Sequence, residues 1–267
     1  MTKNSKKDLT EAVLFQIPIF SNMKELLLEK IAKTVLVGKF DGLYWINTPN
    51  AEQVVQANSD DAFRHVLNRS TIRVPDGVSL VWSSKLLQKL GKIENRIQQR
   101  ISGVDLVKNI CELAEKGSNK VFLLGGRGQV AEFAAQKIRD NYPLIKIGYG
   151  GGFVDIKNPE EDENKRILKE ISDFGTEVLF VGYGAPWQEI WVDVNKKILD
   201  KMGVKLVMVV GGAYDMISGN IRRAPKWMRM AGLEWLWRLI LEPWRWKRQF
   251  RLVKYWWMVG KLLVDDK

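Results

Sequence analysis

The sequence has very little cysteine and histidine. Cys111 and His65 are the single residues of each type among 267. One cysteine excludes an intrachain disulfide and fits a reducing compartment. A zinc site would need several such ligands, so we assign no metal ion and no other cofactor to the protein. We expect Cys111 to be a small buried residue of a helix and His65 to lie on the surface.

Long apolar runs are also missing. No segment approaches the roughly 18 uncharged apolar residues of a membrane-spanning helix. The first eleven residues contain no apolar segment of the kind found in secretory signals. We therefore expect a cytoplasmic protein whose residues 1–11 are disordered. The hydrophobic fraction of 46% still predicts a globular protein with a sizeable core.

Positive charge is concentrated near the end of the chain. Residues 221–267 hold twelve Lys and Arg against four Asp and Glu, so they carry +8 of the formal net charge of +11. Seven of the eleven tryptophans lie in the same stretch. Basic residues interleaved with aromatic residues are typical of surfaces that bind nucleic acid or an anionic membrane, and composition does not choose between them.

Short apolar runs alternate with helical patterns along the first 218 residues, which is typical of a parallel α/β sheet. We predict strands at 13–18, 43–47, 71–74, 121–124, 145–149, 177–181 and 205–210. We predict helices at 21–34, 51–57, 60–68, 78–90, 104–115, 129–140, 159–174 and 187–201. The sequence therefore predicts an α/β, Rossmann-like fold with a mostly parallel sheet flanked by helices.

The pattern changes after Gly219, where strand-like runs end. We expect an α/β domain at residues 1–219 and a helical appendage at residues 220–267, with helices at 226–241 and 244–263. In the second helix the apolar residues form two neighbouring stripes opposite a basic arc: Trp246, Phe250, Val253 and Trp257, and beside them Leu252, Trp256, Val259 and Leu263. The apolar side of this helix could equally pack on the core or contact a membrane interface.

Two glycine-rich turns each follow a predicted strand and precede a helix. Gly125 and Gly126 open the first turn, whose spacing matches a dinucleotide-binding pattern. The next strand supplies no acidic residue that could bind a ribose hydroxyl, so a nucleotide diphosphate fits this turn better than NAD. The alternative that the glycines only allow a tight turn, with no ligand, is not excluded. The second turn runs from Tyr183 to Gln188. Gln188 can bind a sugar hydroxyl or serve only in the first turn of its helix.

Two turns that contain proline place polar side chains directly after apolar runs, where a parallel sheet presents its ligands. In the first turn, Thr48 and Asn50 can orient substrate hydroxyls or phosphate oxygens. In the second, Asp76 is held between a proline and a glycine. A carboxylate fixed in this way can take a proton from an attacking hydroxyl, although Pro-Asp-Gly is also an ordinary turn sequence. No Asp-x-Asp pair follows a predicted strand, so we expect any glycosyl or phosphoryl transfer to be independent of a metal ion held by the protein.

Several of these segments, taken together, resemble the WecG/TagA/CpsF glycosyltransferases. They run in order across residues 13–255, nearly the whole chain, and their combination is specific although most are weak singly. The segments are Thr48-Pro-Asn-Ala-Glu52, Pro75-Asp-Gly77, Arg100-Ile-Ser-Gly-Val-Asp-Leu106, Leu124-Gly-Gly126, Gly182-Tyr-Gly-Ala-Pro-Trp-Gln-Glu189, Arg223-Ala-Pro225, Gly232-Leu-Glu-Trp235, Arg238-Leu239 and Glu242-Pro243.

The resemblance implies an inverting, metal-independent glycosyltransferase that uses a UDP-sugar. The sugar, N-acetylmannosamine or a related hexose or uronic acid, would pass to a polyprenyl-diphosphate-linked sugar during synthesis of bacterial surface polysaccharide or teichoic acid. The resemblance implies Asp76 as the general base and Thr48 as a residue beside the reacting sugars. The substrate-binding residues that we predict are Asn50, Arg100, Gly125, Gly126, Tyr183 and Gln188.

The resemblance also gives the appendage a role. It is expected to dock on the anionic inner face of the cell membrane, which makes the enzyme cytoplasmic and peripherally membrane-associated, and to bring an arginine to the diphosphate. We select Arg222, Arg223 and Arg229 for that contact. The sequence leaves a monomer and a homo-oligomer both open. Two rival functions remain, a non-enzymatic nucleic-acid-binding protein that uses the basic tail and an NAD-dependent oxidoreductase, but we expect no nucleic-acid partner.

Overall fold

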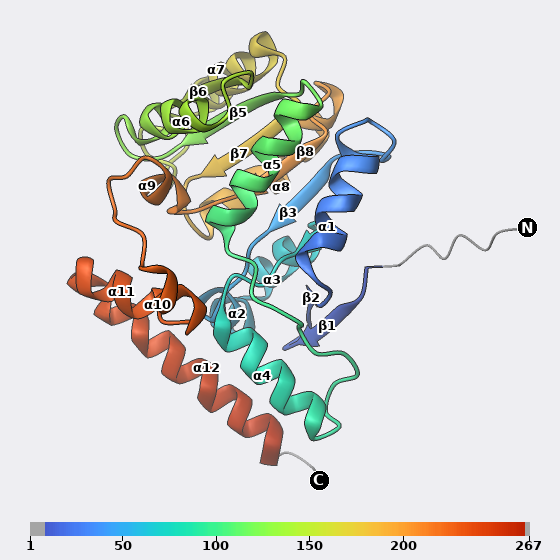
Figure 1. The fold of residues 1–267 in the computed structure, drawn as a ribbon, viewed down its shortest axis with the longest axis vertical. Coiled ribbons are helices and arrows are strands. Elements are labelled where there is room, and N and C mark those ends of the chain that lie inside the picture. The colour runs from blue at the N-terminus through green and yellow to red at the C-terminus, as the bar shows by residue number, and fades with distance from the viewer. Residues whose placement is uncertain (1–8, 265–267) are drawn as a thin grey trace, which may run out of the picture.

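A six-stranded sheet forms the centre of the molecule, as the computed structural model of residues 9–264 shows (Figure 1). All six strands are parallel, in the order β4-β3-β8-β7-β5-β6. They are β3 (Tyr44–Asn47), β4 (Ile72–Arg73), β5 (Lys120–Gly125), β6 (Lys146–Gly150), β7 (Val178–Gly182) and β8 (Leu206–Val209). The α/β class and the mostly parallel sheet predicted from the sequence are confirmed.

Helices cover both faces of the sheet. In β7, Val178 and Phe180 point to one apolar core and Leu179 and Val181 to the other, so the strand is apolar at every position. The first face carries α1 (Lys24–Lys30), α5 (Gly103–Lys116), α6 (Val130–Asn141) and α9 (Ala213–Ile217). The second carries α7 (Glu161–Phe174) and α8 (Trp187–Lys201). As predicted, Cys111 is buried and His65 is exposed.

A third apolar core joins the two ends of the described chain. It contains the hairpin of β1 (Glu11–Leu14) and β2 (Ile17–Phe20), and the helices α2 (Ala51–Ser59), α3 (Asp61–Asn68), α4 (Val78–Lys89) and α12 (Trp246–Val264). Tyr255 of α12 is fully buried there, and its hydroxyl shares a hydrogen bond with that of Ser83 in α4. The last helix of the appendage is therefore part of the packed protein (Figure 1).

The two apolar stripes of α12 have different surroundings. Leu252, Trp256 and Val259 pack against the third core. Trp246, Phe250, Val253 and Trp257 are instead between 53% and 68% exposed. No helix within residues 9–264 is both long and apolar enough to cross a bilayer.

Some elements differ from the sequence-based prediction. The strand expected at 13–18 is a hairpin, because Phe15 and Gln16 adopt positive φ values of 51° and 63° and reverse the chain. The helix expected at 21–34 continues beyond α1 as a π-helical turn, η1 (Ile31–Val35). Disorder is expected from the sequence for residues 1–11. Residues 1–8 lie outside the described residues. Residues 9–11 are described, and Glu11 is the first residue of β1.

The first helix expected in the appendage is interrupted. It forms α10 (Lys226–Met230) and α11 (Glu234–Leu241), and η2 (Pro243–Arg245) links α11 to α12. The interruption falls at Gly232, which has a φ of +74°. A Cβ on this glycine would lie 2.9 Å from a methyl group of Val78, so the close approach to α4 also requires glycine.

The turns at the carboxyl ends of the strands are hydrogen-bonded to one another. The N–H of Val74 donates to the carbonyl of Asn47 at 2.7 Å, and the N–H of Asp76 donates to the carbonyl of Pro49 at 3.0 Å. These two bonds continue the pairing of β3 with β4 beyond the strands. They hold the two predicted proline turns side by side at one edge of the sheet.

A buried carboxyl joins three more segments at the same edge. Oε1 of Glu189 accepts hydrogen bonds from the side-chain amides of Gln53, at 2.9 Å, and Gln188, at 3.0 Å. The side-chain oxygen of Gln188, Oε1, in turn accepts hydrogen bonds from the backbone N–H groups of Gly184 and Gly211. Glu189 thus connects the start of α2 with the turns that follow β7 and β8. Burial raises the pKa of Glu189 to about 7.

This raised pKa predicts a pH-dependent contribution of Glu189 to stability. The folded protein holds the proton more tightly than the unfolded chain, in which the pKa is 4.5. The contribution is therefore complete below about pH 4.5 and is lost as the pH rises through about 7, with a total near 3 kcal/mol. Glu189→Gln mimics the neutral acid and should lack this part of the pH dependence. Urea unfolding at pH 5 and pH 8 measures it, and equal losses in both proteins would contradict the prediction.

Candidate active site

A cavity of about 690 Å³ opens at the carboxyl ends of the strands. Its wall is formed on one side by the turns that follow β3, β4, β7 and β8, and on the other side by the appendage. Among the predicted site residues it includes Thr48, Asn50, Asp76, Arg100 and Gln188. The fold therefore brings together five residues that span more than half of the chain.

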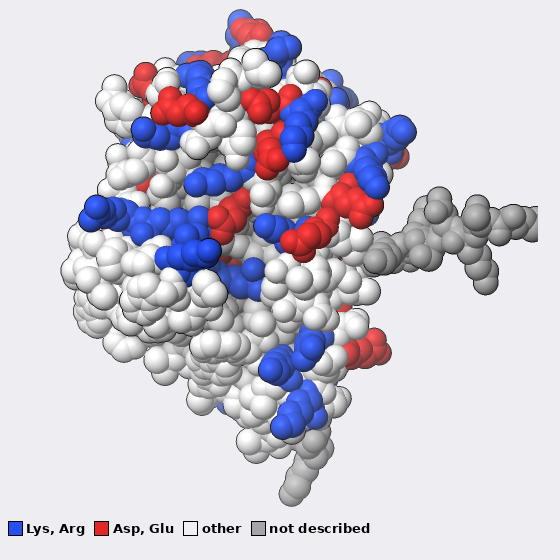
Figure 2. Space-filling view, viewed as in Figure 1, with Lys and Arg blue, Asp and Glu red and all other residues white. Residues whose placement is uncertain are grey.

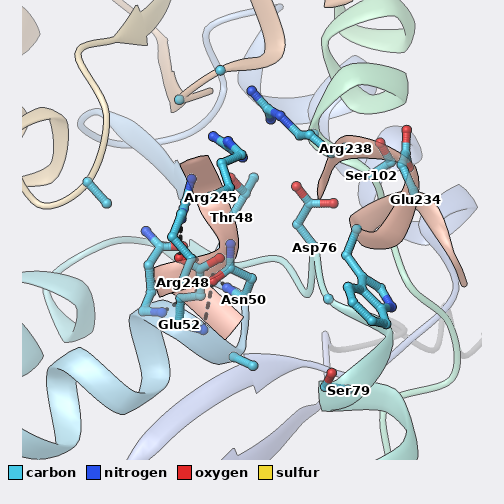
Figure 3. A pocket seen from close by; sticks show the side chains of 18 of the residues that line it. Thr48, Asn50, Glu52, Asp76, Ser79, Ser102, Glu234, Arg238, Arg245 and Arg248 are labelled. Atoms are coloured by element: carbon cyan, nitrogen blue, oxygen red, sulfur yellow. Dashed lines mark hydrogen bonds and ion pairs between the residues drawn. The ribbon is translucent and has the colours of Figure 1, made fainter. Parts of the chain in front are cut away.

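Asp76 and Thr48 lie close together at this cavity (Figure 3). A Cβ placed on Gly103, the first residue of α5, would lie 3.5 Å from Oδ2 of Asp76 and 4.0 Å from Oγ1 of Thr48. The Thr48 hydroxyl donates a hydrogen bond to the carbonyl of Val209 at the end of β8. Both side chains therefore lie beside the first residue of α5. The N-terminus of a helix stabilises negative charge placed next to it.

The protonation of Asp76 is set by opposing influences. Burial raises its pKa above the ordinary value and outweighs Arg100, whose charge and hydrogen bond lower it; the charge of Glu234 raises it further. The side chain is nevertheless 30% exposed, so a substrate hydroxyl can reach it. A carboxylate with a raised pKa is a stronger base than an ordinary aspartate.

Asn50 already has a structural role. Its side-chain oxygen accepts the N–H groups of Glu52 and Gln53, and the Gln53 side chain accepts the N–H of Asn50. This reciprocal arrangement is a capping box that begins α2. Asn50 lines the cavity while it serves as the cap, and substrate contact stays a prediction for it.

Four arginines of the appendage line the cavity opposite the sheet, and the fourth is Arg251. We call Arg238, Arg245 and Arg248 the arginine cluster; they belong to α11, η2 and α12. In Figure 3, Arg238 and Arg245 lie near Thr48, and Arg248 lies beside Glu52 and Asn50. Three acids pair with the cluster: Glu242 with Arg238 and Arg245, Asp215 with Arg238 at 4.0 Å, and Glu52 with Arg248.

The wall that the appendage contributes carries more positive charge than these acids neutralise, because Lys247 and Arg251 line the cavity as well. Burial lowers the pKa of Arg245 to about 10, and the charges of Arg238 and Arg248 add to this effect. Such a concentration of guanidinium groups in a cavity is suited to a multiply charged anion, because planar guanidinium groups bind phosphate oxygens in pairs.

The arginines selected from the sequence have other surroundings. Arg223 binds both carboxylate oxygens of Asp105, at 2.6 and 2.7 Å, and reaches Glu234 at 3.2 Å. Arg222 is exposed, and the Nε of Arg229 is buried without a hydrogen-bond partner among the described residues. None of the three is among the residues that line the cavity. A contact with the diphosphate stays a prediction for them.

The glycines of the first glycine-rich turn pack against aromatic residues. A Cβ on Gly125 would lie 2.9 Å from the ring of Tyr183, and one on Gly126 would lie 3.5 Å from the ring of Tyr214. Gly125, Gly126 and Tyr183 lie outside the lining of the cavity, while Gly184 and Gln188 from the same turn as Tyr183 belong to it. Binding of a nucleotide sugar stays a prediction for the first three.

Sequence reasoning missed the arginine cluster. Arg238 lies in one of the segments that carry the family resemblance, but the selection favoured arginines close to the domain boundary. Arg245 and Arg248 were assigned to the amphipathic end of the chain. The sequence feature that could have identified the arginine cluster is the spacing of its members around Glu242-Pro243, where α11 ends and η2 begins. Among residues 9–264 no group of three or more His, Cys, Asp or Glu can hold a metal ion, and metal independence stays a prediction.

Three known proteins with similar sequences share one name. A segment of 211 residues is 36% identical to the N-acetylglucosaminyldiphosphoundecaprenol N-acetyl-beta-D-mannosaminyltransferase of Bacillus subtilis (strain 168); it covers 79% of this chain and 76% of that protein. Proteins of the same name from Staphylococcus aureus strains MRSA252 and NCTC 8325 / PS 47 are 29% and 28% identical over 233 residues, which cover 87% of this chain and 85% of each relative.

The sequence profile of one family extends over nearly all of the chain. Residues 12–266 match the family described as "Glycosyl transferase WecG/TagA/CpsF family". This match includes both the α/β domain and the appendage, and it confirms the resemblance that the segments around Thr48, Asp76 and Glu234 indicated. The chain belongs to the WecG/TagA/CpsF family of glycosyltransferases.

Proposed function

We propose that this glycosyltransferase moves N-acetylmannosamine from a UDP-sugar to N-acetylglucosamine carried on undecaprenyl diphosphate, in the synthesis of teichoic acid or a related surface polymer. The names of the relatives supply the acceptor and the transferred sugar. The observation that carries the proposal is that Asp76, Thr48 and the arginine cluster line the same cavity. A glycosyl transfer from a nucleotide diphosphate needs both a base and a cationic site for the leaving group.

The proposed chemistry is a single displacement. The carboxylate of Asp76 accepts the proton of the acceptor hydroxyl, whose oxygen forms the new bond to C1 of the donor sugar. The bond between C1 and the UDP oxygen breaks on the opposite face, which inverts the anomeric centre. Thr48, beside Asp76, orients the sugar. The arginine cluster stabilises the negative charge that develops on the departing diphosphate.

The surface of the appendage supports peripheral contact with a membrane. The outer stripe of α12 is exposed, as are Trp227, Met230 and Trp244 in the preceding segments. Figure 2 shows a wide area without charged side chains over α10, α11 and α12. Large exposed apolar surfaces mark interaction sites, and exposed tryptophans are suited to the bilayer interface. We place the enzyme at the cytoplasmic face, where its lipid-linked acceptor can enter the cavity.

The first prediction concerns the base. Asp76→Asn keeps the size of the side chain but cannot accept a proton, so turnover should fall by roughly 10²–10⁴ while binding of UDP changes little. UDP release from UDP-N-acetylmannosamine with a short-chain lipid-diphosphate N-acetylglucosamine acceptor measures turnover, and calorimetry measures binding. Wild-type turnover in the variant would remove Asp76 from the mechanism; no UDP release by the wild-type protein with this pair would contradict the proposed substrates.

A second prediction distinguishes the two sets of arginines. Arg245→Gln should lower turnover about 10²–10³-fold, because it removes a donor that acts on the developing charge. Arg222→Gln is the matched control, since Arg222 is exposed and lies in the same appendage. The same UDP-release assay compares them. A larger loss in the Arg222 variant than in the Arg245 variant would contradict the role of the arginine cluster.

A third prediction concerns the membrane. The double variant Phe250→Ser, Trp257→Ser removes two exposed apolar side chains of α12 and should weaken vesicle binding about 10- to 100-fold. Leu144→Ser with Val194→Ser is the matched control, since both residues are exposed outside the appendage. Sedimentation with vesicles of phosphatidylglycerol and phosphatidylcholine measures binding. Equal binding by the two double variants would show that α12 does not contact the bilayer.

A further inference from the structure

A chain of charged side chains connects the appendage to Asp76. Arg100 donates to Oδ1 of Asp76 at 3.3 Å and to Oε2 of Glu234 at 2.8 Å. Arg223 in turn contacts the other oxygen of Glu234 at 3.2 Å and is bound by Asp105 of α5. Glu234 is the first residue of α11, so an acid of the appendage shares one guanidinium group with the proposed base.

The shared guanidinium lies closer to the appendage than to the base. Nη2 of Arg100 is 0.5 Å nearer to Glu234 than to Asp76. The Glu234 side chain is only 8% exposed, so solvent screens this ion pair weakly. Arg100 also donates from Nε to the carbonyl oxygen of Asp76, which keeps the guanidinium beside the base whichever carboxylate it favours.

The position of Glu234 depends on the docking of α11. The helix begins directly after Gly232, whose close contact with Val78 places it over the start of α4. Arg223 holds Glu234 from the other side and is fixed to α5 through Asp105 and the hydroxyl of Ser102. Glu234 therefore reaches Arg100 when the appendage is seated on the α/β domain as it is in this structure.

We propose that Glu234 is a positioning residue for the reaction: it draws Arg100 away from Asp76, so that the Asp76 carboxylate is free to accept the proton of the acceptor when the appendage is docked. The inference rests on the proposed role of Asp76 as base. It adds that the appendage acts on the attacking side of the reaction, and not only on the leaving diphosphate through the arginine cluster.

The charges around Asp76 give the expected direction of the effect. The charged groups that face Asp76 are Arg100 and Glu234, with the N–H of Gly103 as a further hydrogen-bond donor. Removing the negative charge of Glu234 leaves Arg100 paired with Asp76 alone. The pKa of Asp76 then falls, because Arg100 favours its ionised form and Glu234 no longer opposes it. The carboxylate becomes a weaker base, and it stays ionised to lower pH.

The test is the pH profile of UDP release by the full-length Glu234→Gln variant. Its acidic limb of kcat/KM should move about one pH unit to lower pH, and its turnover on the plateau should fall about 3- to 10-fold. The KM for the UDP-sugar should change less than about twofold, since the arginine cluster is intact. Glu112→Gln is the control: it removes an acid of α5 that pairs with Lys116, outside the chain of charges that reaches Arg100, and its acidic limb should stay at the wild-type pH.

A second variant keeps the test open if Glu234→Gln does not fold. Glu234→Asp retains the charge but is one methylene shorter, so its limb should move in the same direction by a smaller amount. A wild-type limb in both Glu234 variants overturns the inference, and so does an equal shift in Glu112→Gln. The proposed function fails separately: in that case the wild-type enzyme releases no UDP, or Asp76→Asn remains active.

Discussion

The site depends on backbone hydrogen bonds between segments that follow neighbouring strands. The N–H of Asp76 binds the carbonyl of Pro49, and the N–H of Ile101 binds that of Pro75. The second bond adds the segment that leads to Gly103, beside which Asp76 and Thr48 meet. Both side chains are therefore carried by paired main chain, which holds the distance between a base and its substrate more closely than free loops do. Glu189 extends the same restraint to the turns after β7 and β8.

The cavity has different electrostatic characters on its two sides. Near Asp76 each positive charge has an acidic partner, because Arg100 and Arg223 alternate with Glu234 and Asp105. The appendage side of the cavity, where Lys247 and Arg251 add to the arginine cluster, has more cationic groups than acids that pair with them. Burial lowers the pKa of Arg245, and repulsion by Arg238 and Arg248 lowers it further. An anion bound there would relieve that repulsion. The proposed base and the proposed site of the leaving group are thus separated by charge as well as by position.

The sequence predicts the sheet well because the strands at its centre, β7 and β8, carry no polar side chain, and it predicts the turns at Thr48 and Asp76 because proline and glycine mark them. It does not predict the arginine cluster. The position of Arg238 depends on the interruption at Gly232, which places α11 over Val78. The helical periodicity of the sequence does not predict such a contact. The pairing of Glu234 with Arg100 likewise joins residues 134 positions apart. Contacts of this kind arise from packing, which local patterns do not encode.

The two stripes of α12 have a consequence for the membrane contact that we propose. The inner stripe stays packed on the third core, and only the outer stripe from Trp246 to Trp257 is offered to a lipid surface. A segment that folds on binding loses part of its interaction energy to chain ordering. Here the helix is already ordered, so adsorption carries no such entropy loss. A weak and rapidly reversible attachment is then sufficient, and one enzyme molecule can serve many lipid carriers in succession.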